Sequence, residues 1–210
     1  MTEFVRGLLV WRVLPLCRRG EVDRARELIA ANADILDSGN QDFAAGIRVL
    51  GACVLAAAGR EEEAFASAVD GASRAVEAGD AWWIPFNTLD VATQLSDLDL
   101  VAQLLATLDE GNWQPSPGVA AQRARVRARL PGHDPVAELA TAERLFRQLE
   151  MPFFVAAVGV ERAEHLLADG RHDVAVPLLA EVRKEFARLG AVPWLARVDA
   201  ALGRQQAVTA

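Results

Sequence analysis

Apolar and polar residues recur along this chain with the spacing of amphipathic α-helices, and the whole pattern repeats as a cassette. The clearest copy is 170–190, GRHDVAVPLLAEVRKEFARLG, in which one glycine opens an amphipathic helix and a second glycine closes it. Further copies begin at Gly20, Gly59 and Gly132, and a weaker copy begins at Asp97. The starts are roughly 35–40 residues apart, a period typical of helical-hairpin repeats.

The pattern predicts an all-α chain of about five antiparallel helical hairpins followed by a C-terminal capping helix. In each hairpin a first helix runs into a turn and a second helix runs back. The first helices are expected at 3–18, 42–58, 82–95, 119–130 and 152–167. The second helices are expected at 21–36, 61–78, 98–109, 135–149 and 174–189, and the capping helix at 193–202.

One continuous helical-repeat domain is expected over 1–204, because the repeats follow one another without a linker. The loop at 110–118, with its glycines and prolines, is the least repeat-like stretch, and we expect a bend there. Residues 205–210 are expected to fray. Met1 enters a helix almost at once, which leaves the first hairpin without a preceding cap and favours a chain cut from a larger regulator.

Composition narrows the classes of partner. The 210 residues are 52% hydrophobic and carry a formal net charge of -7, which argues against binding to nucleic acid or to an anionic membrane surface. The apolar stretch at 4–16 is interrupted by Arg6 and Arg12 and is too short to cross a bilayer. Cys17 and Cys53 are isolated in apolar helical patterns, so we expect reduced, buried thiols and a cytoplasmic location.

No pattern in the sequence predicts a catalytic residue, a cofactor or a metal site. Glu161 and His165 lie four apart on a helix, with Glu164 and His172 nearby, but a metal needs three or four converging donors. An ion pair or hydrogen bond on the helix surface is the favoured interpretation. The four alternating arginines of 123–129 are scattered around a helix and predict no stripe of charge.

The best candidate for binding is the aromatic third hairpin, which begins AWWIPFNTLDVATQL. Neighbouring residues on a helix point about 100° apart, so Trp82 and Trp83 cannot face the core equally, and one is a candidate for the concave groove. Phe86 and Asn87 follow within a turn, and Arg48 comes from the preceding hairpin. Together they predict a surface for a peptide or a small molecule. The alternative is that both indole rings fill core between hairpins.

The alternating hairpins, alanine-rich second helices and glycine turns resemble tetratricopeptide-like repeats, and this resemblance implies a right-handed α-solenoid. The tail at 185–202, EFARLGAVPWLARVDAAL, resembles the end of the C-terminal helical-repeat region of actinobacterial ATP-binding LuxR-type regulators and cyclase-like signalling proteins. In such proteins the repeats act as an interaction or sensing platform. The sequence contains no GxxxxGKS/T phosphate loop, no cyclase domain and no recognisable DNA-reading helix-turn-helix.

These observations leave three hypotheses for function. The first is a non-catalytic interaction module that binds a protein or peptide segment in the concave groove. The second is a small-molecule sensor with an apolar pocket near Trp82, Trp83 and Phe86. The third is a self-association module that forms a homodimer. An open groove with free polar groups favours the first, a closed and largely apolar cavity the second, and an exposed apolar end hairpin the third.

Overall fold

The computed structural model describes residues 9–33, 41–78, 83–111 and 116–209 of the chain. These ranges consist of α-helices and the turns between them, and they contain no strand. The all-α class expected from the hydrophobic pattern is therefore confirmed.

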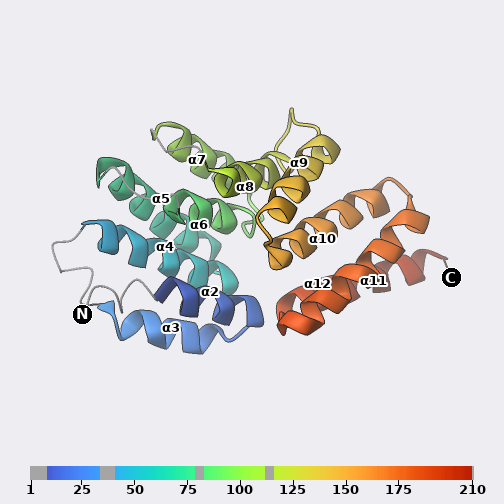
Figure 1. Cartoon of the computed structure of the whole chain (residues 1–210), viewed down its shortest axis with the longest axis horizontal. Helices are drawn as coiled ribbons and strands as arrows, with labels where there is room; N and C mark the ends of the chain where they lie inside the picture. The colour runs from blue at the N-terminus through green and yellow to red at the C-terminus, as the bar shows by residue number, and fades with distance from the viewer. Residues whose placement is uncertain (1–8, 34–40, 79–82, 112–115, 210) are drawn as a thin grey trace.

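Within the described ranges, five helical hairpins and a last helix follow one another (Figure 1). The first two hairpins are α2 (Leu9–Arg19) with α3 (Val22–Ala30), and α4 (Gln41–Ala57) with α5 (Glu61–Ala78). The next two are α6 (Trp83–Ala92) with α7 (Leu98–Asp109), and α8 (Pro117–Arg127) with α9 (Pro135–Gln148). The last hairpin is α10 (Pro152–Ala168) with α11 (His172–Leu189), and the chain ends in α12 (Val192–Thr209).

The glycines that open the predicted cassettes have the backbone conformation that a hairpin turn requires. Gly20, Gly59, Gly132 and Gly170 have φ angles of 80°, 74°, 86° and 74°, a left-handed region that residues with a Cβ rarely enter. Each glycine therefore lets the first helix of its hairpin end and the chain reverse. The weaker copy has no such glycine, and its Asp97 side chain accepts backbone hydrogen bonds from the first turn of α7 instead.

Helix ends differ from the prediction most clearly in α3 and α12. α3 ends at Ala30, earlier than predicted, and the Asn32 side chain donates a hydrogen bond at 2.8 Å to a carbonyl oxygen of its last turn. α12 continues to Thr209, although 205–210 was expected to fray. Gly203 precedes this stretch, and the next four residues (204–207, RQQA) are good helix formers.

The hairpins follow an arc, so that the two ends of the chain's helical array come together (Figure 1). The first helix of each hairpin lies on the inner side of the arc, together with α12. α12 contacts α10, α11 and also α2. A Cβ built on Gly20 would lie only 3.1 Å from the Pro193 ring. The last helix, predicted to cap the stack, therefore also packs against the first hairpin and closes the arc.

Small and aromatic side chains form the core between the inner and outer helices. α5 presents four fully buried alanines, Ala64, Ala68, Ala72 and Ala75. Their small size lets α4 and α5 approach closely, as the sequence predicted. Further along, Phe86, Phe146 and Phe154 pack together. The Phe86 and Phe154 ring centroids are 5.2 Å apart and nearly perpendicular, and those of Phe146 and Phe154 are 4.9 Å apart and stacked.

Candidate functional site

A partly enclosed cavity of about 1060 Å³ lies at the centre of the arc. This volume is at the upper end of the range for pockets that bind small ligands. Side chains from all six inner helices, α2, α4, α6, α8, α10 and α12, form its wall. The cavity is therefore the concave side of the helical array.

Equivalent positions of the six inner helices meet in this cavity. Arg18, Cys53, Asp90, Arg125, Glu161 and Arg197 follow one another at intervals of 35–37 residues. We call these six residues the inner ring. Five of the six are charged, and the sign alternates from Asp90 to Arg197. Hydrogen bonds join Arg125 directly to Asp90 and Glu161, so four consecutive positions of the inner ring, from Asp90 to Arg197, carry charges of alternating sign.

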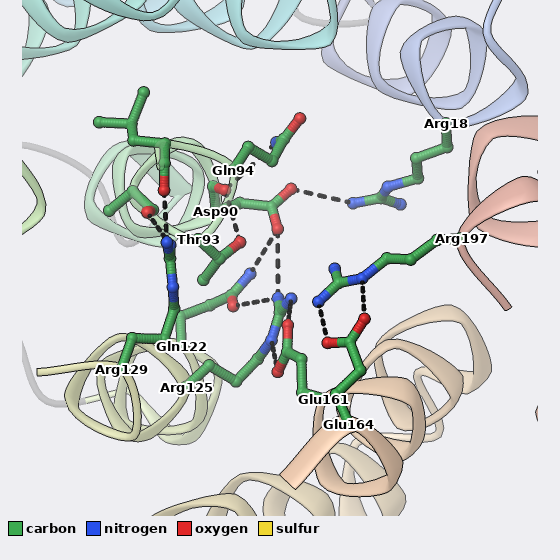
Figure 2. A network of polar contacts seen from close by, with 12 residues as sticks. Arg18, Asp90, Thr93, Gln94, Gln122, Arg125, Arg129, Glu161, Glu164 and Arg197 are labelled. Atoms are coloured by element: carbon green, nitrogen blue, oxygen red, sulfur yellow. Dashed lines mark hydrogen bonds and ion pairs between the residues drawn. The ribbon is translucent and has the colours of Figure 1, made fainter. Parts of the chain in front are cut away.

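Arg125 is at the centre of the polar contacts in Figure 2, and only 1% of its side chain is exposed. Its Nε and Nη2 donate hydrogen bonds to the Glu161 carboxylate at 3.1 and 2.5 Å, a bidentate pair between α8 and α10. Its Nη1 donates to Gln122 Oε1 at 2.8 Å and to Asp90 Oδ1 at 3.3 Å. Burial lowers the pKa of Arg125, but Glu161 and Asp90 more than offset this, so the pKa lies above its ordinary value.

Two further arginines of the cavity are also held in place. Arg197 of α12 donates to Glu164 of α10 through Nε and Nη2, at 2.9 and 2.6 Å. Arg129 has no carboxylate within ion-pair distance among the described residues. It donates instead to the carbonyl oxygens of Ala92, at 2.7 Å, and of Leu95, at the C-terminal end of α6. Burial lowers the pKa of Arg129, while the partial negative charge of a helix C-terminus favours the cation there.

Arg18 of α2 is the least well paired charge of the inner ring. Its Nη2 lies 3.9 Å from Asp90 Oδ2, beyond hydrogen-bond distance, and the side chain is 24% exposed where it lines the cavity. Its guanidinium carbon lies 4.3 and 4.5 Å from the ring centroids of Phe153 and Phe154, as cation–π contacts. Burial lowers the pKa of Arg18, and Asp90 offsets this only in part.

Both cysteines line the cavity as free thiols, Cys53 buried and Cys17 half-buried. Burial raises the pKa of Cys17 to about 11, and burial also raises the pKa of Cys53 well above its ordinary value. Both side chains are therefore protonated at neutral pH. Cys53 is buried as expected, whereas Cys17 is only half-buried.

Of the five residues predicted from the sequence to bind a ligand, the four that the structure describes do not line this cavity. Trp83 is half-buried against α4, with its ring so close to Gly46 that a Cβ there would come within 2.5 Å. Phe86 belongs to the aromatic core, and buried Asn87 donates a hydrogen bond to the Trp83 carbonyl oxygen at 2.7 Å. Trp83 thus has the environment that the core alternative described.

Arg48, the fourth of these described residues, is also away from the cavity wall. Arg48 of α4 forms an ion pair with Asp70 of α5 and donates to the Ala44 carbonyl oxygen at 3.1 Å. Trp82 lies outside the described residues. A binding role for these five residues stays a prediction.

Glu161 has a different environment from the helix surface on which the sequence placed it. It is only 8% exposed, and its partner is Arg125 rather than His165. Glu164 is occupied by Arg197, while His165 lines the cavity. In the part of the chain that the structure describes, no three His, Cys, Asp or Glu side chains form a group that could hold a metal ion.

The inner ring was not predicted from the sequence, although charged residues recur at the repeat interval. The repeat interval predicts which positions of successive inner helices become neighbours, and charged residues occupy five of the six. Alternation in sequence scatters the four arginines of 123–129 around the helix, yet Arg125 and Arg129 lie four apart and so share one helix face. Both line the cavity.

No protein-family model, curated protein or solved structure matches this chain. The resemblance to tetratricopeptide-like repeats and to actinobacterial regulators therefore stays a prediction from sequence. No helix in the described ranges is both long enough and apolar enough to cross a membrane.

Proposed function

We propose that this chain is a non-catalytic recognition module that binds a segment of a partner protein in the central cavity. Its hairpins form a tetratricopeptide-like α-solenoid, and it is the repeat region of a bacterial signalling or transcriptional regulator of the cytoplasm. The observation that carries the proposal is the cavity itself, because all six inner helices contribute to its wall.

The regular construction of the cavity supports a repeat array. The inner ring recurs at the interval of the cassettes, and the turns between paired helices use left-handed glycines at matching places. Repeat arrays bind partners on the concave surface that their stacked helices create. The tail at 185–202 supports the link with regulators only through its resemblance in sequence.

The polar groups of the cavity suit recognition better than catalysis. Arg125 and Arg197 are fixed by bidentate pairs with carboxylates, so they stay charged and keep one orientation. The thiols of Cys17 and Cys53 have raised pKa values, which makes them poor nucleophiles at neutral pH. The wall therefore offers fixed charges and apolar surface without an activated nucleophile among these groups.

A small-molecule sensor is the second candidate, and the cavity volume of about 1060 Å³ favours it. The wall also contains charged groups, however, and some of them are only partly paired. The charge of Arg18 in particular has only the distant carboxylate of Asp90 as its ion-pair partner among the described residues. A groove with free polar groups favours the first hypothesis over a sensor of apolar molecules.

The proposal can be tested by filling the cavity. The full chain is incubated with random dodecapeptides, and co-eluting peptides are identified by mass spectrometry after gel filtration. The variant Ala57→Trp places a large side chain in the cavity wall on α4. Its matched control is Ala66→Trp on an exposed position of α5. Circular dichroism establishes that both variants fold.

We expect the wild-type chain and Ala66→Trp to retain a common set of peptides, and Ala57→Trp to retain them at least about tenfold less. Equal retention by both variants would place the binding site outside the cavity. If the wild-type chain retains no peptide but a pool of metabolites yields a ligand that Ala57→Trp loses, the sensor replaces the interaction module.

A further inference from the structure

We infer that the cavity recognises a carboxylate attached to an apolar group, and that this carboxylate binds between Arg18 and Arg197, where the inner ring closes. The inference rests on the proposed function, because it names the part of the partner segment that enters: a C-terminal residue with an apolar side chain.

Charged neighbours in the inner ring have opposite signs, except where α12 meets α2. Asp90 and Glu161 lie on either side of Arg125, and Arg197 follows Glu161. The next position in the ring is Arg18, because α12 contacts α2. Two arginines are therefore neighbours in ring order with no acidic ring position between them. Figure 2 shows both side chains directed toward the middle of the network.

The cavity has one positive charge in excess, although the whole chain has a formal net charge of -7. Four arginines and three carboxylates line it. A carboxylate brings the single negative charge that balances this excess. A phosphate monoester brings about −1.5 to −2 at neutral pH and would overcompensate it.

Arg18 and Arg197 have donors available for such an anion. Arg18 donates no hydrogen bond within the described part of the chain, so the five N–H groups of its guanidinium are free there. Arg197 uses Nε and Nη2 for Glu164, and its Nη1 has no partner among the same residues. The planar fork of a guanidinium matches the two oxygens of a carboxylate. The ion pair with Asp90 and the phenyl rings hold the Arg18 fork in place.

Two aromatic rings between these arginines supply the apolar surface. The Arg18 guanidinium lies 4.3 Å from the Phe153 centroid, and that of Arg197 lies 5.2 Å from the Trp194 centroid. The Phe153 and Trp194 centroids are 5.5 Å apart, and both side chains line the cavity. A carboxylate next to an apolar side chain could therefore bind the guanidinium groups while its side chain packs on the rings.

The C-terminal residue of a protein chain supplies a carboxylate next to an apolar side chain. A C-terminal residue carries the carboxylate and the side chain on one carbon atom. Because α2 and α12 close the arc, a chain end can enter the cavity without a following segment that must leave again. A small apolar carboxylic acid offers the same chemistry, so the experiment separates the two sources.

The test uses heptapeptides with six random positions and Leu, Phe or Trp last, synthesised once as free acids and once as C-terminal amides. Retention by the full wild-type chain is measured as above. We expect the free acids to be retained at least about tenfold more than the amides, because an amide end carries no negative charge for the two guanidinium groups to pair with. Sodium benzoate and inorganic phosphate are tested separately as ligands and as competitors.

Variants of one helix locate the carboxylate. Arg18→Gln removes the charge, and Arg18→Lys keeps the charge but loses the fork. Arg12→Gln, at an exposed position of the same helix, is the matched control. We expect Arg18→Gln to abolish the difference between acid and amide, Arg18→Lys to reduce it, and Arg12→Gln to leave it unchanged. If Arg18→Gln does not fold, the acid and amide pools still decide the question on the wild-type chain.

The outcomes separate this inference from the function on which it rests. Equal retention of acids and amides overturns the carboxylate site and leaves the interaction module standing. No retained peptide, together with benzoate binding that Arg18→Gln removes, overturns the interaction module and supports the carboxylate site. Stronger binding of phosphate than of benzoate overturns the choice of a carboxylate. Absence of binding by all of these probes overturns both proposals.

Discussion

At the scale of single residues, Arg125 joins three inner helices through buried polar groups. It lies on α8 and contacts Asp90 of α6 and Glu161 of α10. Burying a charge is costly, and the cost is recovered only if each charge keeps its partner. The network therefore stabilises one arrangement of the inner helices strongly only while it is complete.

We predict that Arg125→Met lowers the free energy of unfolding by about 3–5 kcal/mol, because it leaves Glu161 buried without its partner. The double variant Arg125→Met with Glu161→Leu should be more stable than the single variant. Urea unfolding of the single and the double variant measures these free energies, with Arg123→Met as the control. Arg123 pairs with Asp109 in a more exposed position, so its loss should cost about 1 kcal/mol or less. Equal costs for Arg125→Met and Arg123→Met would contradict the account.

The raised pKa of Cys17 predicts slow alkylation. With a pKa of about 11 instead of 9.0, the thiolate fraction at pH 8 is about 100-fold lower than for an ordinary thiol. In the variant Cys53→Ala, which leaves a single thiol, the rate of reaction with iodoacetamide should still rise about eightfold per pH unit around pH 10. When the same variant is unfolded in urea, its alkylation rate should stop rising near pH 9.0, the ordinary pKa of a thiol. Levelling of the native rate near that pH would show that burial does not raise the pKa.

The sequence predicted the burial of some of these residues but not how their side chains pair. The burial of Cys53 followed from its place on an apolar face, and the close packing of α5 followed from its alanines. The pairing of Arg125 with Glu161 did not follow, because helical spacing shows which residues share a face but not which face meets which. The repeat interval holds that information only once equivalent positions have been aligned.

At the scale of helices, the turn without a glycine is held by the preceding hairpin. The Ser96 N–H and hydroxyl donate hydrogen bonds to Glu61 at 2.7 and 2.6 Å. Glu61 opens α5, and Ser96 lies 35 residues later, in the turn between α6 and α7. These bonds lower the pKa of Glu61. An acid in the first turn of a helix is also favoured by the helix dipole.

Because the pKa of Glu61 is lower in the folded chain than in the unfolded chain, its ionised carboxylate stabilises the fold at pH values above the unfolded pKa of 4.5. This stability is lost as the pH falls through the lower pKa of the folded chain. We predict that Glu61→Gln loses about 1 kcal/mol at pH 7, and that the difference from the wild-type chain shrinks below pH 4.5. Thermal unfolding across pH 3–7 provides the measurement. The neighbouring exposed acid gives the control variant Glu62→Gln. A difference that stays constant with pH would disprove the role of the charge.

Helices were the level at which the sequence was most informative. The amphipathic pattern located every hairpin of the described ranges, and cassette glycines marked the turns of four of the five, since both the apolar stripe and the left-handed turn are local properties. The errors are at ends such as Ala30 and Thr209, where a single side chain or a short run of helix formers decides the boundary.

At the scale of the whole molecule, the arc closes because α12 returns to α2. The sequence predicts a stack of hairpins that a C-terminal helix caps. It could not predict the closure, because no local pattern records a contact between the first and last helices. Closure brings Arg197 and Arg18 to the same cavity and converts a concave surface into a partly enclosed site.

The central claim is that a partner segment binds in this cavity, and chemical-shift mapping by NMR tests it most directly. The full chain, labelled with ¹⁵N, is titrated with the free-acid heptapeptide that it retains best. We predict shifts at Arg18, Glu161 and Arg197 and along the inner faces of α2, α10 and α12, with α3 and α5, which do not line the cavity, unchanged. Shifts confined to the outer helices, with the inner ring unperturbed at saturation, would contradict the claim.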